Sequence, residues 1–288
     1  MIRSMTGFAR VEAQGPWGRL AWELRAVNHR YLDVSLRLPE DLRGLEGEVR
    51  TRAAARVSRG KLEAGLRFSQ DGAEAAPILV DADKLKQLRR ALDAATAELG
   101  AVTPPDPVRV LAWPGIVKAE TRDNAPVQAA ALKLLDQALG EFTRAREQEG
   151  ARLAQYLRER CDALEGHAAE VRKRLPEVRT QWAEKLRQRC RDLGVEVEPS
   201  RLEQEVVMAA QRLDVDEELS RLASHLTAVR DAISRDEAVG RKLDFLMQEL
   251  NREANTLASK SQDAEVTRRA VDIKVIIEQM REQVQNIE

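Results

Sequence analysis

The sequence is poor in aromatic residues, because its 288 residues include only four Phe, four Trp and two Tyr. A hydrophobic core must therefore be built mainly from Leu, Val and Ala, which favours helices over a β-sandwich or a β-barrel. The 15 Gly and 10 Pro are also too few for a loop-rich all-β protein.

Long apolar runs are also missing. None approaches the ~20 residues that span a bilayer, and residues 1–6 lack the apolar segment of a secretory signal. The two cysteines, Cys161 and Cys190, occupy apolar positions of predicted helices, so we expect both to stay reduced. We therefore expect a cytoplasmic protein with no membrane association.

Neither sign of charge is in excess. The 47 Lys and Arg nearly balance the 48 Asp and Glu, which excludes a simple polybasic nucleic-acid binder. The charge is nevertheless segregated. Basic residues outnumber acidic ones 13 to 8 over residues 1–70 and 8 to 2 over 171–191, but acidic residues outnumber basic ones 8 to 2 over 196–218. This pattern suits a protein that binds a phosphate backbone beside a metal or acid–base centre. It equally suits complementary subunit surfaces or ordinary solvated faces.

Several enzyme signatures are absent. The sequence has no GxxxxGK[ST] loop, no GxGxxG after a strand, no HExxH, no paired CxxC and no GxSxG. Nothing therefore indicates a P-loop NTPase, a dinucleotide enzyme, a zinc protease or an α/β-hydrolase.

The periodicity of apolar residues predicts the fold. Alternation over 20–26, 32–38 and 62–68 predicts half-buried strands, residues 1–13 suit a further strand, and 40–57 suits an amphipathic helix. We therefore predict an α+β fold, in which a small N-terminal antiparallel sheet with a covering helix precedes a long, mainly helical region. The predicted domains are an α+β domain over 1–76 and a helical domain over 77–288. The latter comprises a coiled-coil-like arm over about 126–195 and a C-terminal block over about 200–288.

The predicted arm has a heptad pattern. Apolar residues recur every seven positions, at Ala154, Cys161, Ala168, Leu175 and Trp182, as in coiled coils. Pro176 predicts a kink or break near Leu175. The pattern fits packing within the chain and packing between subunits equally well.

The segment over 240–257 has an apolar stripe and two polar faces. Asn251 and Asn255 lie four residues apart, and because Asn lowers helix stability, they are either buried hydrogen-bond partners or ligand contacts. Glu249 and Glu253 have the same spacing. Like charges so placed repel unless a cation, an Arg or a proton lies between them. The alternative is a solvated face bridged to arginines of another helix.

A second acidic cluster begins at Asp214. Asp214 and Glu218 share a helix face, on which Arg221 and His225 follow. Such a stripe can bind phosphate, hold a divalent metal or move a proton. The simpler interpretation is that Asp214 or Asp216 caps a helix, and His225 suits a core histidine equally well.

A polar corner lies between two predicted strands at residues 27–31. His29 is flanked there by Asn28 and Arg30, and Tyr31 could stack on a base. As a bare pattern this is a weak signal, since Asn-His is a common turn pair.

Several blocks of the sequence together resemble the YicC/YloC family of bacterial proteins. They are MIRSMTGF at 1–8, ELRAVNHRYLD at 23–33, RGK at 59–61, the segment 240–260, and REQVQN at 281–286. The resemblance spans the whole chain. It implies an endoribonuclease that depends on a divalent metal (Mg²⁺ or Mn²⁺), cuts single-stranded RNA and acts in the turnover of small regulatory RNA. It further implies a ring-like homo-hexamer that encloses RNA, and contact with other RNA-turnover enzymes.

Spacing within the matched blocks selects candidate site residues. Glu249 and Glu253 are the first candidates for catalysis and metal binding, with Glu218 as a further ligand and His225 as a further catalytic residue. An ion held by carboxylates would activate water and bridge phosphate oxygens, and Asn251 and Asn255 would orient the carboxylates. The expected RNA-binding residues are Arg241, Arg252 and Lys260 on the C-terminal segment, and Arg25, His29, Arg30, Arg59 and Lys61 on the sheet domain.

Three alternatives stay open at this point. Cleavage could instead use attack by the ribose 2′-OH, with His225 or His29 as the base and no metal. The chain could be a non-catalytic adaptor that presents RNA to another nuclease. The heptad pattern alone would also suit a coiled-coil scaffold with no RNA role.

Overall fold

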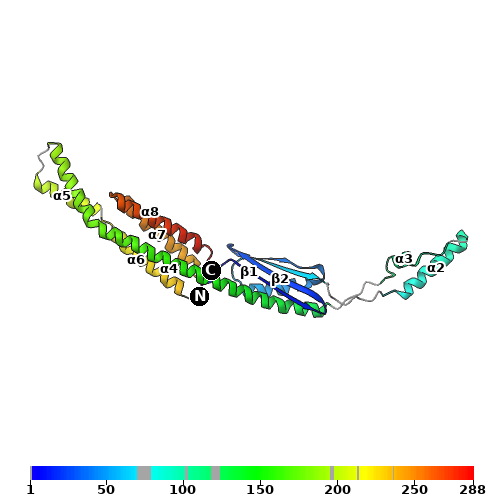
Figure 1. The fold of residues 1–288 in the computed structure, drawn as a ribbon. Helices are drawn as coiled ribbons and strands as arrows, with labels where there is room; N and C mark the ends of the chain where they lie inside the picture. The colour runs from blue at the N-terminus through cyan, green and yellow to red at the C-terminus, as the bar shows by residue number, and fades with distance from the viewer. Residues whose placement is uncertain are drawn as a thin grey trace.

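The computed structural model describes residues 2–69, 79–100, 103–117, 124–194, 198–212, 214–235 and 237–288. Its strands are β1 (Gly7–Gly15), β2 (Gly18–Val27), β3 (Leu32–Arg37) and β4 (Gly60–Ser69). Its helices are η1 (Glu40–Leu45), α1 (Glu46–Ala54), α2 (Ala82–Leu99), α3 (Pro107–Leu111), α4 (Ala125–Asp192), α5 (Pro199–Arg212), α6 (Asp216–Ser234), α7 (Gly240–Lys260) and α8 (Ala264–Val284). The predicted α+β class is confirmed (Figure 1). The predicted domain boundary after residue 76, and the end of the predicted arm at residue 195, lie outside the described residues.

The four strands form one sheet in the order β1-β2-β4-β3. β2 pairs antiparallel with β1 and β4, as predicted, but β3 pairs parallel to β4, so the prediction of a purely antiparallel sheet is wrong. The cause is the connection, since η1 and α1 carry the chain from β3 back to the start of β4 in a crossover. Residue alternation revealed the strands but not the direction of this pair.

One face of the sheet is buried and the other is open. Trp22, Leu24 and Leu62 on the inner face pack against α1 and the first part of α4. The indole Nε1 of Trp22 donates a hydrogen bond to the carbonyl oxygen of Ala131 on α4 (2.8 Å). The sheet core therefore includes a helix that begins far beyond residue 76.

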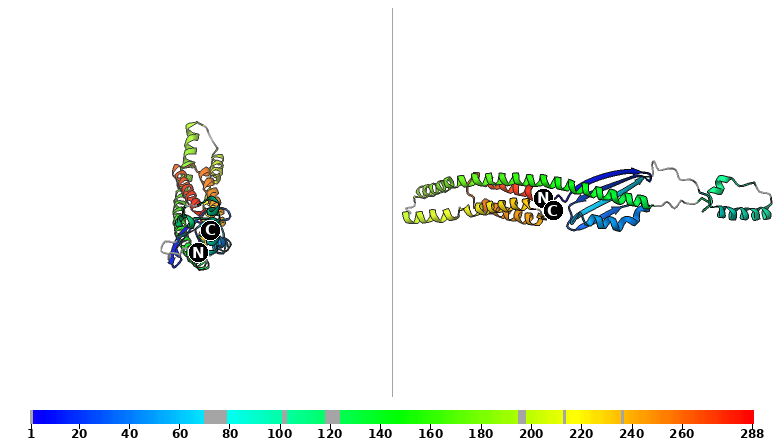
Figure 2. Two further views of the ribbon diagram at one scale, coloured as in Figure 1. Left: turned by 90° about the vertical axis from the view of Figure 1, so that its right-hand side faces the viewer. Right: turned by 90° about the horizontal axis from the view of Figure 1, so that it is seen from below.

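The rest of α4 packs against α6 and α8, and these two helices in turn pack against α7 (Figure 2). The heptad residues Cys161 and Leu175 are buried in this second core, so the heptad seam is covered within the chain. α4 continues through Pro176 to Asp192, and the predicted break is not present.

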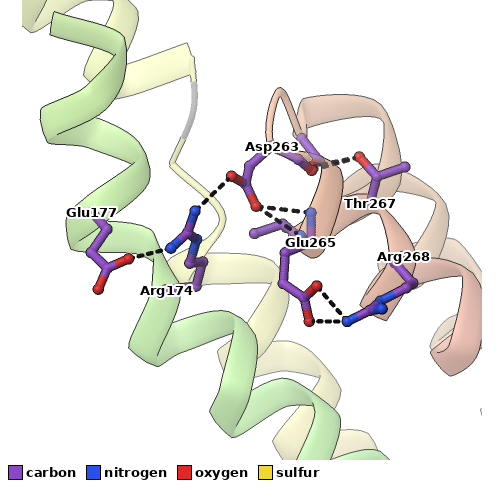
Figure 3. Close-up of polar contacts among 8 residues, drawn as sticks. Arg174, Glu177, Asp263, Glu265, Thr267 and Arg268 are labelled. Carbon is purple, nitrogen blue, oxygen red and sulfur yellow. Dashed lines mark hydrogen bonds and ion pairs between the residues drawn. The ribbon is translucent and has the colours of Figure 1, made fainter. Parts of the chain in front are cut away.

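An ion-pair network fixes the start of α8 against α4 (Figure 3). The carboxylate of Asp263 caps α8 by accepting hydrogen bonds from the backbone N–H groups of Glu265 and Val266 (3.0 and 3.1 Å). Arg174 of α4 donates to the same carboxylate (3.3 Å) and also pairs with Glu177. The cap therefore also joins the two helices.

The two ends of the chain meet where the sheet joins the helical bundle (Figure 1). The backbone N–H of Met5 donates to the carbonyl oxygen of Asn286 (2.7 Å), and that of Glu288 donates to the carbonyl oxygen of Arg3 (2.9 Å). Arg146 of α4 is 1% exposed, donates to the carbonyl oxygen of Ser4 (2.6 Å) and pairs with the Glu288 carboxylate. We call these contacts the terminal clasp.

α2 and α3 lie beyond the far end of the sheet from the bundle (Figures 1 and 2). Asp81 and Asp106 cap these two helices, and Pro107 occupies the first turn of α3. No residue of α2 or α3 is buried. Among the described helices, none combines the length and hydropathy needed to cross a bilayer.

Candidate functional site on helices α6, α7 and α8

α7 carries the densest set of predicted site residues. Its buried stripe, which confirms the predicted apolar stripe over 240–257, includes Leu243, Leu250 and Leu257, and these residues pack into the bundle core. The remaining faces point toward α6, toward α8 or toward solvent. Residues three and four apart therefore divide into separate groups around this helix.

Two of the predicted carboxylates lie between α6 and α7. Glu253 is 5% exposed, and its Oε1 lies 3.8 Å from the Nη1 of Arg221 on α6. Glu218 is 7% exposed, and its Oε1 accepts a hydrogen bond from the Nζ of Lys260 (2.8 Å). Each buried carboxylate thus faces a cation of the protein, as burial of a charge requires. This matches the alternative in which the acidic residues pair with basic ones of a neighbouring helix.

Glu218 keeps one unused acceptor. Its Oε2 is buried and has no hydrogen-bond partner among the described residues. Most buried polar atoms are paired, so this oxygen is a place where a further donor or cation would be stabilised. Lys260 also donates to the carbonyl oxygen of Asp214 (3.0 Å) and thereby ties the end of α7 to the start of α6.

Glu249 and His225 form a second, more open group. Both side chains are half-buried, and Glu249 has no ion pair within the described residues. α6 and α7 are antiparallel neighbours, and Arg221 faces Glu253. His225 lies one turn after Arg221 on α6, and Glu249 lies one turn before Glu253 on α7. Because the two helices run in opposite directions, these two steps lead to the same level. This register places an acid and an imidazole at the same level of the helix pair.

The predicted metal ligands do not converge in a single chain. In the parts of the chain that the structure describes, no three His, Cys, Asp or Glu side chains are grouped so that they could hold an ion. Glu218, Glu249 and Glu253 therefore do not form a complete metal site by themselves. The divalent metal therefore stays a prediction.

The asparagines of α7 face a hollow. Asn255 is exposed and Asn251 is half-buried, so they are not buried hydrogen-bond partners, although the Nδ2 of Asn255 donates a weak hydrogen bond to the Oδ1 of Asn251 (3.4 Å). A role in ligand contact stays a prediction. Both asparagines line a hollow of about 320 Å³ together with Met247, Gln248, Arg252, Thr256 and Arg281. We call this the α7 hollow.

Arg281 is the residue that α8 contributes to the α7 hollow, and the sequence did not single it out. Its Nε is buried without a hydrogen-bond partner among the described residues and lies 3.8 Å from the nearest carboxylate oxygen, that of Asp244. Sequence spacing along α7 cannot reveal a residue contributed by α8. The result is a hollow that combines amide groups with two guanidinium groups.

The predicted cations of α7 are spread out. Arg241 stands at the beginning of the helix and Lys260 at its end, about 28 Å apart at 1.5 Å per residue. Only Arg252 lines the α7 hollow. The three residues therefore do not form one phosphate site.

The polar corner between β2 and β3 is tied to the terminal clasp. Asn28 donates to the carbonyl oxygen of Gln285 (2.7 Å), and Arg59 donates to the carbonyl oxygen of His29 (3.2 Å). The Nδ1 of His29 lies 3.0 Å from the carbonyl oxygen of Tyr31. The structure thus brings three of the predicted RNA-binding residues, His29, Arg30 and Arg59, to one corner.

Aromatic and basic groups are exposed together at this corner. Tyr31 is 64% exposed, and the guanidinium of Arg30 lies over its ring, 5.3 Å from the centroid. Arg25 and Lys61 lie on the adjoining open face of the sheet. The corner and the face therefore form one surface that could meet a nucleic acid.

Comparison with known proteins identifies the family. Residues 2–155 match the family model described as "Endoribonuclease YicC-like, N-terminal region", and residues 171–288 match "Endoribonuclease YicC-like, C-terminal". A protein of Haemophilus influenzae named "Probable endoribonuclease YicC" is 42% identical over 290 residues, and one of Clostridioides difficile with the same name is 33% identical over 293 residues. Both alignments cover the full length of each chain. The chain therefore belongs to the YicC-like endoribonuclease family.

Proposed function

We propose that this protein is an endoribonuclease that cuts single-stranded RNA bound along α7. The observation that carries the proposal is the α7 hollow, an open space lined by Asn251, Asn255, Arg252 and Arg281. The helix that provides three of these residues also carries Glu249. Guanidinium groups suit phosphates, and amide groups suit the edges of unpaired bases. The names of the relatives support the same activity.

The chain's own residues support acid–base cleavage. In this route Arg252 and Arg281 neutralise the phosphate, and Glu249 or His225 accepts the proton of the ribose 2′-OH. The 2′-oxygen forms a bond to phosphorus, the bond to the 5′-oxygen breaks, and the other group returns a proton to that leaving oxygen. The products are a 2′,3′-cyclic phosphate and a 5′-OH.

Metal-assisted hydrolysis is the route that the family resemblance implies, and it stays a prediction. It would leave a 5′-phosphate or a 3′-phosphate rather than a cyclic phosphate, and chelation would stop it. Identifying the ends of the cleaved RNA, with and without EDTA, therefore distinguishes the two routes.

The decisive experiment is cleavage of an end-labelled, unstructured RNA by the purified protein and by Glu249→Gln. We expect wild type to cut and Glu249→Gln to cut at least 100-fold more slowly, since acid–base groups contribute about 10²–10⁴-fold. Glu203→Gln, an exposed residue of α5, is the matched control. Full activity of Glu249→Gln would remove Glu249 from the site.

A non-catalytic RNA adaptor is the second candidate. It is favoured by the pairing of Glu218 with Lys260 and of Glu253 with Arg221, which gives both carboxylates a purely structural role. This alternative predicts RNA binding that weakens with salt and no cleavage even with Mn²⁺.

We further propose that the protein self-associates, with the hexamer implied by the family resemblance as the expected state. The support is the α2–α3 unit, where Leu92, Leu99 and Trp113 are 38%, 78% and 58% exposed. These two helices border a mainly apolar hollow of about 850 Å³. Exposed apolar patches of this kind mark interaction surfaces. Small-RNA turnover, association with RNA-turnover enzymes and a cytoplasmic location stay predictions.

A further inference from the structure

The open face of the sheet is hollowed at its centre. Gly65 of β4 faces Glu23 of β2 on one side and Arg37 of β3 on the other. Around it lies a hollow of about 340 Å³, lined by Glu23, Arg25, Ser35, Arg37, Glu63, Ala64, Gly65, Leu66 and Arg67. We call this the Gly65 hollow.

The fold itself does not require glycine at position 65. A Cβ built there would meet only the carbonyl oxygen of Glu23, at 4.0 Å, and the residue does not adopt a positive φ. Glycine inside a strand weakens it and often marks the close approach of a ligand. The missing side chain therefore points to something that occupies the hollow from outside.

Three exposed arginines line the hollow. Arg25, Arg37 and Arg67 are exposed, and none of them forms an ion pair with a described residue. On the same face, Arg10 and Arg19 both pair with Glu12. Unpaired guanidinium groups from three strands suit phosphate groups, which they bind through planar, bidentate contacts.

The remaining groups favour a nucleic-acid strand over a bare phosphate ion. Glu23 and Glu63 also line the hollow, and their carboxylates would repel an isolated anion but accept hydrogen bonds from hydroxyl groups. Phe8 is 54% exposed and stands opposite Arg25 in the register of β1 and β2. An exposed aromatic ring beside basic residues is a stacking platform for unpaired bases.

We propose that the Gly65 hollow binds the sugar–phosphate backbone of an RNA strand, with Phe8 stacking on a neighbouring base. The arginines hold the phosphate, and the carboxylates face the ribose hydroxyl groups. This inference rests on the proposed RNA substrate, and it places a binding site on the sheet, separate from the α7 hollow.

The test is Gly65→Val, measured by fluorescence anisotropy with a labelled single-stranded RNA. A Cβ has room at this position, the further methyl groups of valine would project into the hollow, and valine suits a strand. We therefore expect an unchanged or higher melting temperature together with at least fivefold weaker RNA binding. Unchanged binding by a folded Gly65→Val protein would overturn the proposal.

Arg37→Gln and Arg67→Gln give a second readout. Each phosphate contact that is lost should lower the slope of log K against log salt concentration by about 0.7, whereas a purely structural defect would leave the slope unchanged. Arg158→Gln, which removes an exposed charge on α4, is the matched control and should keep the wild-type slope. Slopes equal to wild type in both variants would also overturn the proposal.

Cleavage of the same RNA separates this inference from the proposed function. If wild type cuts RNA and the sheet variants bind normally, the sheet site is wrong and the endoribonuclease stands. If wild type never cuts, but binding falls in the sheet variants, the sheet site stands and the endoribonuclease is wrong.

Discussion

Arg146 is the most deeply buried charged residue among those described. Its guanidinium is held between the Ser4 carbonyl oxygen and the Glu288 carboxylate, and Glu288 also accepts a hydrogen bond from Ser58. Removing one partner of a buried pair costs more than the pair itself contributes, because the other charge is left without compensation.

We therefore expect Arg146→Met to lower the free energy of unfolding by about 3 kcal/mol, measured by urea denaturation. Arg144→Met, which removes an exposed arginine from the neighbouring turn of α4, should change it by less than about 0.5 kcal/mol. Equal effects of the two substitutions would contradict the role assigned to the terminal clasp.

Asp263 links stability to pH. Burial alone would raise the pKa of this carboxyl, but the hydrogen bonds from Val266 and Glu265 and the ion pair with Arg174 outweigh burial, so its pKa is lowered. A lowered pKa means that the ionised form stabilises the folded state above the unfolded pKa of about 4. That stability is lost as the pH falls through the folded pKa.

Asp263→Asn tests this, because asparagine still caps a helix but carries no charge. At pH 7 we expect the variant to be about 1–2 kcal/mol less stable than wild type, and the difference should shrink toward pH 3. Urea denaturation at several pH values measures it. A difference in stability that stays constant with pH would contradict the contribution assigned to the ionised Asp263 carboxylate.

The two cysteines should differ in reactivity. Burial raises the pKa of the Cys161 thiol to about 11, so the thiolate is scarce at neutral pH, whereas Cys190 is only half-buried. A thiol-reactive dye at pH 7.5 should rapidly modify only Cys190 in the native protein, but both Cys161 and Cys190 in urea. Rapid modification of both native thiols would contradict the burial of Cys161.

At the scale of single elements, α4 contains glycines with opposite roles. A Cβ at Gly166 would meet nothing within 4 Å, but a Cβ at Gly150 would lie 2.1 Å from the carbonyl oxygen of Ile2. Gly166→Ala should therefore raise the free energy of unfolding by about 0.5–1 kcal/mol. Gly150→Ala should lower it, because the helix can no longer approach the N-terminal segment. Thermal and urea denaturation measure the stability of both variants. An increase in stability in both would contradict the close approach of Gly150 to Ile2.

The elements themselves were largely predictable from the sequence. Alternation over 20–26 and 62–68 identified β2 and β4, and the 3.6-residue period identified α7 with its buried Leu250. The pairing of elements was not predictable in the same way. Alternating residues do not reveal whether a strand pairs parallel or antiparallel with its neighbour, as β3 shows. A heptad pattern likewise does not reveal which helices pack against it.

The candidate site was less predictable than the fold, because contacts between distant elements create it. The sequence identified Glu249, Asn251 and Arg252, which share α7. It missed Arg281, which α8 adds to the α7 hollow, and it missed Arg37 and Arg67, which meet only after β3 and β4 pair. Glu218 and Glu253 were selected as metal ligands, but the structure pairs them with Lys260 and Arg221, so the sequence did not reveal their partners.

At the scale of the whole molecule, the α2–α3 unit has an apolar face that no other described part of the chain buries. Leu92→Glu would place a charge on this face without disturbing a monomer core, so we expect it to dissociate the oligomer. Gln87→Glu adds the same charge outside the apolar hollow and should leave the assembly intact. Sedimentation velocity measures both, and an unchanged mass for Leu92→Glu would contradict association through this face.

The terminal clasp has a consequence for the order in which the molecule forms and comes apart. The pairing of Ser4 with Ile287 closes a loop of nearly the entire chain. Closing so large a loop costs conformational entropy, and contacts between residues so distant in sequence form slowly. The sheet and the helical bundle should therefore be structured before they lock together. A molecule stretched between its two extremities in an optical trap should yield first at this central seam, while both halves are still intact.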